Sequence, residues 1–251
     1  MIGLLIIGDE ILSSQIQEKN LKYMLRNLAI SGYKVSEARI IGDDFKLISD
    51  TVKELSEKYD YVITSGGVGP THDDITSEAI ADSFNVSLEV NVMLEKLLNQ
   101  YFKEKINSDI LRMAKLPSGS DVIMKEKSEW PIIKMKNVFI LPGVPQIFQK
   151  KFDHVLQLLP QVEKYFYASV YSIVDESEFV EFLRKLQEKY GSVVIGSYPV
   201  INEVEYKTQV TIKSKDKEIL ATCYEEMKSF LLSNSWLYKS IEPSFYNPSV
   251  K

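Results

Sequence analysis

The sequence has almost no cysteine and no long hydrophobic run. Cys223 is the only cysteine among 251 residues, so the chain can form neither an internal disulfide nor a zinc site with four cysteine ligands. No segment reaches the ~18 apolar residues that a membrane span requires. The apolar start, residues 2–7, lacks the basic flank of a signal peptide and runs directly into Gly8-Asp9-Glu10. We therefore expect a cytoplasmic protein with Cys223 in its core.

Positive charge and histidine are also scarce. The chain has 30 Lys and Arg against 35 Asp and Glu, a net charge of -5, and only two histidines. This balance argues against a general affinity for nucleic acid or for an anionic membrane. No serine, histidine and acid grouping resembles a nucleophilic triad. Small anionic substrates remain open, because a bound metal ion can supply positive charge locally.

Apolar runs alternate with segments of helical period through the first 160 residues. The spacing predicts strands at residues 2–7, 34–41, 61–64 and 137–141, and a short β-excursion over 121–136. Helices are predicted near 18–31, along the stripe formed by Phe45, Ile48, Val52 and Leu55, from about residue 75, and over 91–105 and 144–159. This alternation implies right-handed crossovers and a mostly parallel sheet with helices on both faces.

The pattern changes after residue 160. A strand at 167–174, a helix at 176–190, strands at 193–199 and 205–214, and a helix at 217–233 are predicted in succession. The order β-α-β-β-α is enough for a small second domain. We therefore predict an α/β protein in which residues 1–162 form the parallel-sheet domain and residues 163–251 form a small α+β domain.

Three predicted strands end in acidic pairs. The pairs are Asp9-Glu10, Asp43-Asp44 and Asp73-Asp74. In a parallel sheet the carboxyl ends of the strands share one edge, where ligands bind. Clustered carboxylates suit a hard divalent cation that can polarise a pyrophosphate.

The acidic pairs also have a purely structural interpretation. Asp44 lies where one helix starts, and Asp74 or Thr76 where the next one starts, so each could be an N-cap. Three such pairs on one rim, beside a glycine-rich loop, favour a metal site over capping alone.

The glycine-rich loop follows the predicted strand at 61–64. Gly66, Gly67 and Gly69 permit positive φ angles and a close backbone approach, so their amide groups can point at a phosphate. The alternative is a tight strand-to-helix turn. The loop lacks the Gly-Lys-Ser/Thr of a Walker motif, and it does not follow the first strand as a Rossmann fingerprint does. His72, in the same loop, is interpreted as a solvated turn residue.

These blocks resemble the molybdopterin-binding superfamily, which includes the MogA- and MoaB-type adenylyltransferases and CinA. The resemblance is carried by the segments 8–12, 42–43 and 64–79 and by Asn20. The segments 116–119, 141–145 and 196–199 are similar to the branch that contains CinA and the N-terminal region of eukaryotic FAD synthases. Two departures lie near the site: Glu18 stands where the family commonly has aspartate, and Ser13-Ser14 replaces a glycine-containing stretch.

The resemblance implies a metal-dependent dinucleotide pyrophosphatase that hydrolyses FAD or ADP-ribose to a nucleoside monophosphate and a second phosphate. It assigns Asp43 and Asp74 as catalytic and metal-binding carboxylates, with Asp9 and Glu10 as further metal ligands. The substrate-binding residues that it implies are Asn20, Ser65, Gly66, Gly67, Gly69 and Thr71. The implied cofactor is Co²⁺, Mn²⁺ or Mg²⁺, with K⁺ as an additional cation, and the implied assembly is a homodimer or homotrimer.

Two alternatives remain open. The same rim could transfer an adenylyl group to molybdopterin, or the chain could be a catalytically silent module that binds a flavin or a partner. The domain that makes FAD from FMN and ATP in bifunctional synthases is missing from the sequence, so we expect no FAD synthesis by this chain.

Overall fold

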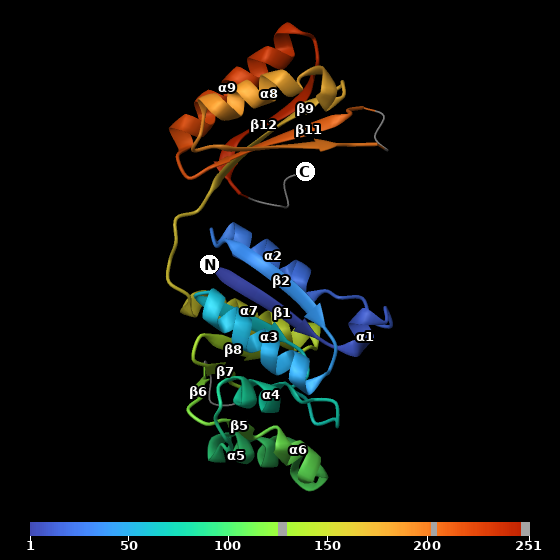
Figure 1. Ribbon diagram of the computed structural model, residues 1–251, viewed down its shortest axis with the longest axis vertical. Coiled ribbons are helices and arrows are strands. Elements are labelled where there is room, and N and C mark those ends of the chain that lie inside the picture. Colours follow the sequence, from blue (N-terminus) through green and yellow to red (C-terminus); the bar gives the residue numbers. More distant parts are fainter. Residues whose placement is uncertain (125–129, 202–204, 247–251) are drawn as a thin grey trace. The chain divides into compact units, whose positions relative to one another are not determined.

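The computed structural model describes residues 1–124, 130–201 and 205–246, and the chain divides into two compact units (Figure 1). The N-terminal unit comprises residues 1–29 and 33–161, and the C-terminal unit comprises residues 30–32 and 162–251. Each unit has its own hydrophobic core. Within the described residues, no helix has both the length and the apolar character needed to cross a membrane.

A six-stranded sheet forms the centre of the N-terminal unit. Its order is β2-β1-β3-β8-β7-β6, and the first four strands are mutually parallel. The strands are β1 (Ile2–Ile7), β2 (Val35–Ile41), β3 (Tyr61–Ser65), β6 (Asp121–Ile123), β7 (Ile132–Met135) and β8 (Val138–Leu141). All six residues of β1 are buried, as expected for a central strand covered on both faces. The predicted mostly parallel α/β fold is confirmed.

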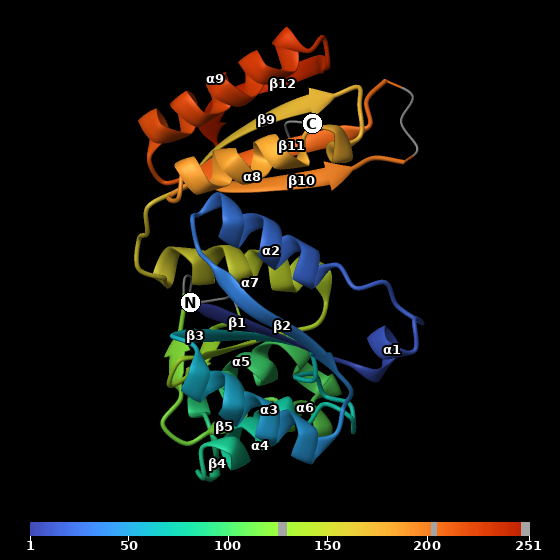
Figure 2. The same cartoon turned by 45° about the horizontal axis from the view of Figure 1, so that its top comes forward.

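Helices cover both faces of this sheet (Figure 2). Helices α2 (Asn20–Ile30) and α7 (Pro145–Leu158) pack on one face, and α3 (Phe45–Lys58) and α4 (Thr76–Ser83) pack on the other. A short helix, α1 (Asp9–Leu12), follows β1 directly. Because β1 pairs with β2 on one side and with β3 on the other, the chain reverses its direction of winding at β1. Such a switch point leaves a crevice at the carboxyl ends of the strands.

The region between α4 and β7 contains more structure than the sequence pattern predicted. The helix expected over residues 91–105 is α5 (Val92–Phe102), followed by one 3₁₀ turn, η1 (Lys103–Lys105). The elements that were not predicted are β4 (Leu88–Val90), β5 (Lys115–Pro117) and α6 (Ser108–Arg112). They are three to five residues long, too short to show a period. The β-excursion predicted at 121–136 is the antiparallel pair β6 and β7, and its central residues 125–129 lie outside the described part.

The C-terminal unit is a four-stranded antiparallel sheet with helices on one face (Figure 1). The sheet order is β10-β11-β9-β12, and Cys223 is fully buried on α9, as predicted. The elements are β9 (Phe166–Ser172), η2 (Glu176–Glu178), α8 (Val180–Lys189), β10 (Val194–Pro199), β11 (Thr208–Ser214), α9 (Lys217–Ser233) and β12 (Leu237–Phe245).

Strand β12 extends the predicted β-α-β-β-α order to β-α-β-β-α-β. Its pairing with β9 shifts register between Leu237 and Lys239 and again between Ile241 and Ser244. Such bulges interrupt the alternation of inward and outward side chains. The sequence of this segment therefore lacks the period of two by which a strand is recognised.

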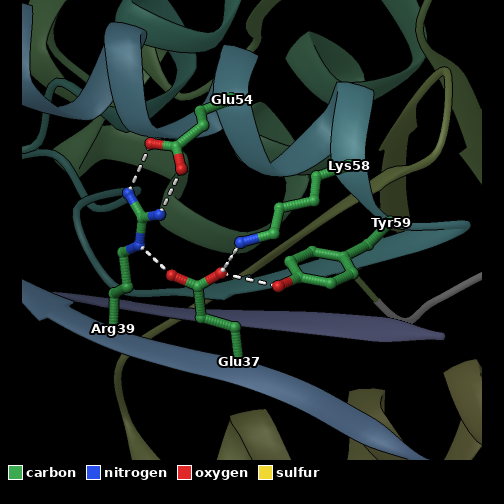
Figure 3. Close-up of polar contacts among 5 residues, drawn as sticks. All are labelled: Glu37, Arg39, Glu54, Lys58 and Tyr59. Atoms are coloured by element: carbon green, nitrogen blue, oxygen red, sulfur yellow. Dashed lines mark hydrogen bonds and ion pairs between the residues drawn. The ribbon is translucent and has the colours of Figure 1, made fainter.

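A polar network joins the edge strand β2 to helix α3 (Figure 3). Arg39 donates a hydrogen bond to Glu37 at 2.6 Å and a bidentate pair of hydrogen bonds to the Glu54 carboxylate at 2.7 and 2.5 Å. Glu37 also accepts hydrogen bonds from Lys58 at 2.7 Å and from the Tyr59 hydroxyl at 2.6 Å. These contacts, led by those from Lys58, Tyr59 and Arg39, lower the pKa of Glu37 to about 2.

We expect Glu37→Gln to reduce the acid sensitivity of the fold. The pKa of Glu37 is lower in the folded chain than its ordinary value of 4.5, so its stabilising contribution is present above that value and is lost as pH falls toward 2. The melting temperature of the parent should therefore fall more steeply than that of the variant between about pH 5 and pH 2. Glu57→Gln, on helix α3 and outside the network, should follow the melting curve of the parent. Parallel curves for all three proteins would contradict the assignment.

Candidate active site

A cavity of about 820 Å³ opens in the N-terminal unit at the carboxyl ends of the parallel strands. Its lining includes Glu10 after β1, the loop from Ser65 to Pro70 after β3, and residues 142–145 after β8. Asn20, at the start of α2, and Asp74 add polar groups to the wall, as do Gln17, Glu18 and Lys19. The switch point of the sheet therefore coincides with this cavity, and the cavity volume is typical of small-molecule sites.

Two glycines shape the loop after β3. Gly66 has φ 114°, and a Cβ atom there would lie 2.0 Å from the carbonyl oxygen of Ile7. Gly67 has φ 65°, and its Cβ would lie 2.2 Å from Thr76 Oγ1. Thr76 locks the loop, since its hydroxyl donates to the Gly66 carbonyl at 3.0 Å and its amide donates to the Gly67 carbonyl at 2.9 Å. A side chain at either glycine would force the loop to move.

The loop presents free backbone donors. Among the described residues, the backbone amides of Gly67, Val68 and Gly69 donate to no acceptor. The adjacent wall is the N-terminus of α7, where the N-cap residue Val144 provides no side-chain hydrogen bond. The two segments touch, because a Cβ at Gly143 would lie 3.4 Å from the Gly66 Cα. Unsatisfied amide groups and the positive end of a helix dipole together favour an anion such as phosphate.

Asn20 holds the cavity wall together. Its amide nitrogen donates to Ser65 Oγ at 3.0 Å and to the Gly143 carbonyl at 2.7 Å. Ser65 Oγ in turn donates to the Pro142 carbonyl at 3.2 Å. Asn20 is only 5% exposed, and its Oδ1 atom has no hydrogen-bond partner in the described part of the chain. Asn20 and Ser65, both predicted to bind substrate, thus link the loops after β3 and β8.

Asp9 and Asp43 form a reciprocal pair beside the glycine loop. The amide of Asp9 donates to Asp43 Oδ2 at 2.9 Å, and the amide of Asp43 donates to Asp9 Oδ1 at 3.3 Å. Gly42 leaves the room for this contact, since a Cβ there would lie 2.2 Å from Asp9 Oδ1. Asp43 Oδ1 lies 3.5 Å from the position of a Cβ at Gly67. Neither Asp9 nor Asp43 lines the cavity itself.

Burial raises the pKa of the Asp43 carboxyl, and the charges of Asp9, Glu10 and Asp73 raise it further. No lysine or arginine in the described ranges forms an ion pair with Asp9, Glu10 or Asp43. A cluster of carboxylates that lacks a cationic partner is an electrostatic setting that a metal ion would relieve.

Asp43 does not cap a helix. Asp44 caps α3, accepting a hydrogen bond from the Leu47 amide at 2.7 Å, as the structural interpretation predicted. Asp74 and Thr76 were alternative caps for α4, and that prediction is wrong. Ile75 occupies the N-cap position of α4 and makes no side-chain hydrogen bond.

Asp74 instead closes its own loop. Its carboxylate accepts hydrogen bonds from the Thr71 amide at 2.8 Å and from the Thr71 hydroxyl. Arg112, from α6, donates to the carbonyls of Thr71 at 3.0 Å and of Asp74 at 2.9 Å. Arg112 was not predicted, because it follows the loop by about 40 residues in the chain and reaches it only in the folded protein. The Thr71 hydroxyl, predicted to bind phosphate, is engaged by Asp74.

The four predicted metal ligands fall into two groups. Asp9, Glu10 and Asp43 lie together, while Asp74 is bound to Thr71. Across residues 1–124, 130–201 and 205–246, no three acidic, histidine or cysteine side chains are arranged to hold a metal ion by themselves. The donor chemistry fits Mg²⁺ or a similar ion, which usually binds one or two carboxylates and completes its shell with water and substrate phosphate.

Fold and site together define a doubly wound α/β protein whose crevice presents free backbone amides close to carboxylates. The profile of the family described as "Probable molybdopterin binding domain" matches residues 3–163. The profile described as "FAD synthase, middle domain" matches residues 164–240. The chain belongs to the molybdopterin-binding domain family, in the branch that includes CinA-like proteins and FAD synthases.

Individual relatives agree with this assignment. The "Probable FAD synthase" of Caenorhabditis elegans is 30% identical over 95% of this chain, which spans 51% of that protein. A protein of Sulfolobus acidocaldarius is 30% identical, with 88% of this chain and 91% of that protein covered. The crystal structure of CinA from Thermoplasma acidophilum has a TM-score of 0.56 and 26% identity, covering 62% of this chain and 96% of that one. The chain spans about half the length of the nematode relatives.

We expect Arg112→Ala to loosen the loop from Thr71 to Asp74. The variant loses two hydrogen bonds from a charged donor, so exchange of the Thr71 amide proton should accelerate roughly ten-fold or more. Arg112→Lys should restore part of the protection. Arg184→Ala, which removes surface pairs on α8, is the matched control and should leave Thr71 exchange unchanged. Unchanged exchange in Arg112→Ala would show that Asp74 holds the loop without help.

Proposed function

We propose that the chain is a metal-dependent dinucleotide pyrophosphatase that hydrolyses FAD or ADP-ribose to a nucleoside monophosphate and a second phosphate. One observation carries the proposal: the free amides of the glycine loop lie next to the carboxylate of Asp43. A phosphate bound by the loop would sit beside a partly buried carboxylate, and a cation between them would relieve the repulsion of the two negative charges.

Asp43 and Asp9 would hold the divalent ion. When bound, such an ion neutralises charge on the pyrophosphate and lowers the pKa of a coordinated water. The protein's own groups would orient the reactants. Amides of Gly67 and Gly69, with the N-terminus of α7, would bind one phosphate, and Asp9 would fix the Asp43 carboxylate through their reciprocal hydrogen bonds.

The reaction needs a nucleophilic water and a leaving phosphate. Asp43 would accept a hydrogen bond from the attacking water and so orient it toward the phosphorus. The water oxygen bonds to one phosphorus, the bond from that phosphorus to the bridging oxygen breaks, and the bridging oxygen leaves with the second phosphate.

Adenylyl transfer to molybdopterin is the second candidate. It is favoured by the description of the family profile that matches residues 3–163. It would use the same crevice, but an acceptor other than water would attack the phosphorus.

Chromatography of FAD and ADP-ribose incubated with the pure protein separates these functions. With Co²⁺, Mn²⁺ or Mg²⁺, the proposal predicts AMP and FMN in equal amounts from FAD, and no products when EDTA is present. FAD retained without cleavage under every metal would support a binding module instead. Adenylyl transfer would require molybdopterin and ATP and would leave FAD intact.

A further inference from the structure

The lining of the cavity in the N-terminal unit also includes an apolar set of residues that do not belong to the glycine loop. Six lining residues form it, and none of them carries a charge: Leu97, Leu98, Tyr101, Phe102, Met113 and Trp130. We call this set the aromatic arm. Four of its members come from the last two turns of α5, a helix of the region inserted between α4 and β7.

The base of the aromatic arm is anchored in the protein core. Leu98 is 2% exposed, and Phe102, Met113 and Trp130 pack against the same hydrophobic cluster. Tyr101 differs from them, because 82% of its surface is exposed. Among the aromatic rings of the described residues, the ring of Tyr101 contacts that of Phe102, edge to face, with ring centroids 5.0 Å apart and an interplanar angle of 75°. A firm apolar floor with an exposed aromatic ring at its edge is suited to stacking a flat ligand.

Two parts of the cavity lining differ in chemistry. One part offers backbone amides and the N-terminus of α7 to phosphate, and the aromatic arm offers an apolar surface without charged side chains. A ligand that contacts both parts must carry a phosphate group and a broad, flat ring with an apolar edge. The fused isoalloxazine ring of a flavin has such an edge, in its dimethylbenzene part. Adenine carries polar donors and acceptors on most of its edges and is less suited to this surface.

We propose that the aromatic arm binds the isoalloxazine ring of a flavin nucleotide, with Tyr101 stacking on the ring. This inference rests on the proposed function, because it assigns one substrate class to the same cavity. It predicts that FAD is preferred over ADP-ribose, and that the preference comes from α5 rather than from the glycine loop. Met113 adds a polarisable thioether that contacts aromatic rings favourably.

Riboflavin tests the ring site without any phosphate chemistry. Titrating the protein into riboflavin and following the loss of flavin fluorescence gives a Kd for the ring alone. Tyr101→Ala should weaken riboflavin binding roughly ten-fold, the loss expected for one aromatic stacking contact. Tyr101→Phe should bind as the parent does. Tyr198→Ala removes a 55% exposed tyrosine from the C-terminal unit and is the matched control.

The two proposals fail in different ways. Equal riboflavin affinity in the parent and in Tyr101→Ala, or no riboflavin binding at all, would overturn the ring site even if FAD is cleaved. Tyr101-dependent riboflavin binding without FAD cleavage would keep the ring site and remove the pyrophosphatase. Because Tyr101 is largely exposed, the melting temperature of Tyr101→Ala should equal the parent's, so that weaker binding reports the lost contact.

Discussion

Asp43→Asn should lower the turnover of FAD by at least ~100-fold while the protein stays folded. That loss is roughly 2.7 kcal/mol of transition-state stabilisation. Asparagine keeps the shape of the side chain and can still accept the hydrogen bond from the Asp9 amide. It loses the negative charge that a hard cation prefers and the basicity that activates water. The effect should therefore fall on kcat at saturating metal, with little change in melting temperature.

The adjacent residue supplies the control for this prediction. Asp44 caps α3, and asparagine caps a helix about as well as aspartate. Asp44→Asn should therefore keep both turnover and stability close to the parent's. Near-normal turnover in Asp43→Asn would mean that this carboxylate is not part of the chemistry. Asp74→Asn should also lose activity, in its case with a loosened loop, because both of its contacts with Thr71 change.

Gly66→Ala should destabilise the N-terminal unit by roughly 3 kcal/mol or more. Two costs add. Alanine must adopt φ 114°, and its Cβ would lie 2.0 Å from a backbone carbonyl oxygen that cannot move without displacing β1. Substrate binding should disappear as well, because relief of the clash moves the amides of the glycine loop.

Gly119 separates the two costs. It has φ 82°, and a Cβ there would meet nothing within 4 Å. Gly119→Ala therefore carries backbone strain alone, about 1 kcal/mol. Urea unfolding of both variants measures the difference. Equal destabilisation would show that the contact between Gly66 and the Ile7 carbonyl imposes no steric limit.

The central strands β1 and β3 were predictable because they are covered on both faces of the sheet. The runs 2–7 and 61–64 contain no charged residue, and turn residues follow each strand. Such runs identify central strands without any knowledge of the fold. Their order along the chain then places the ends of β1, β2 and β3 on one edge, so the sequence pointed to the edge of the sheet at which the cavity opens.

The details of the site depend on contacts that the sequence does not encode locally. Arg112 reaches Thr71 from a five-residue helix about 40 positions later. Asp74 follows a loop and precedes a helix, as an N-cap does, yet its carboxylate binds Thr71. Four members of the aromatic arm share the helical spacing of α5, but Met113 and Trp130 join them only when the inserted region folds. Residues that act through tertiary contacts leave no periodic signal.

The most direct test of the pyrophosphatase is the fate of the water oxygen. FAD is incubated with the protein and a divalent metal in water enriched in ¹⁸O, and AMP and FMN are analysed by mass spectrometry. The proposed function predicts equal amounts of the two products, with one ¹⁸O atom per cleavage, carried by the product whose phosphorus the water attacked. Asp43→Asn should yield neither product at a comparable rate. Intact FAD after prolonged incubation with each metal, or products without ¹⁸O, would contradict hydrolysis as the activity of this chain.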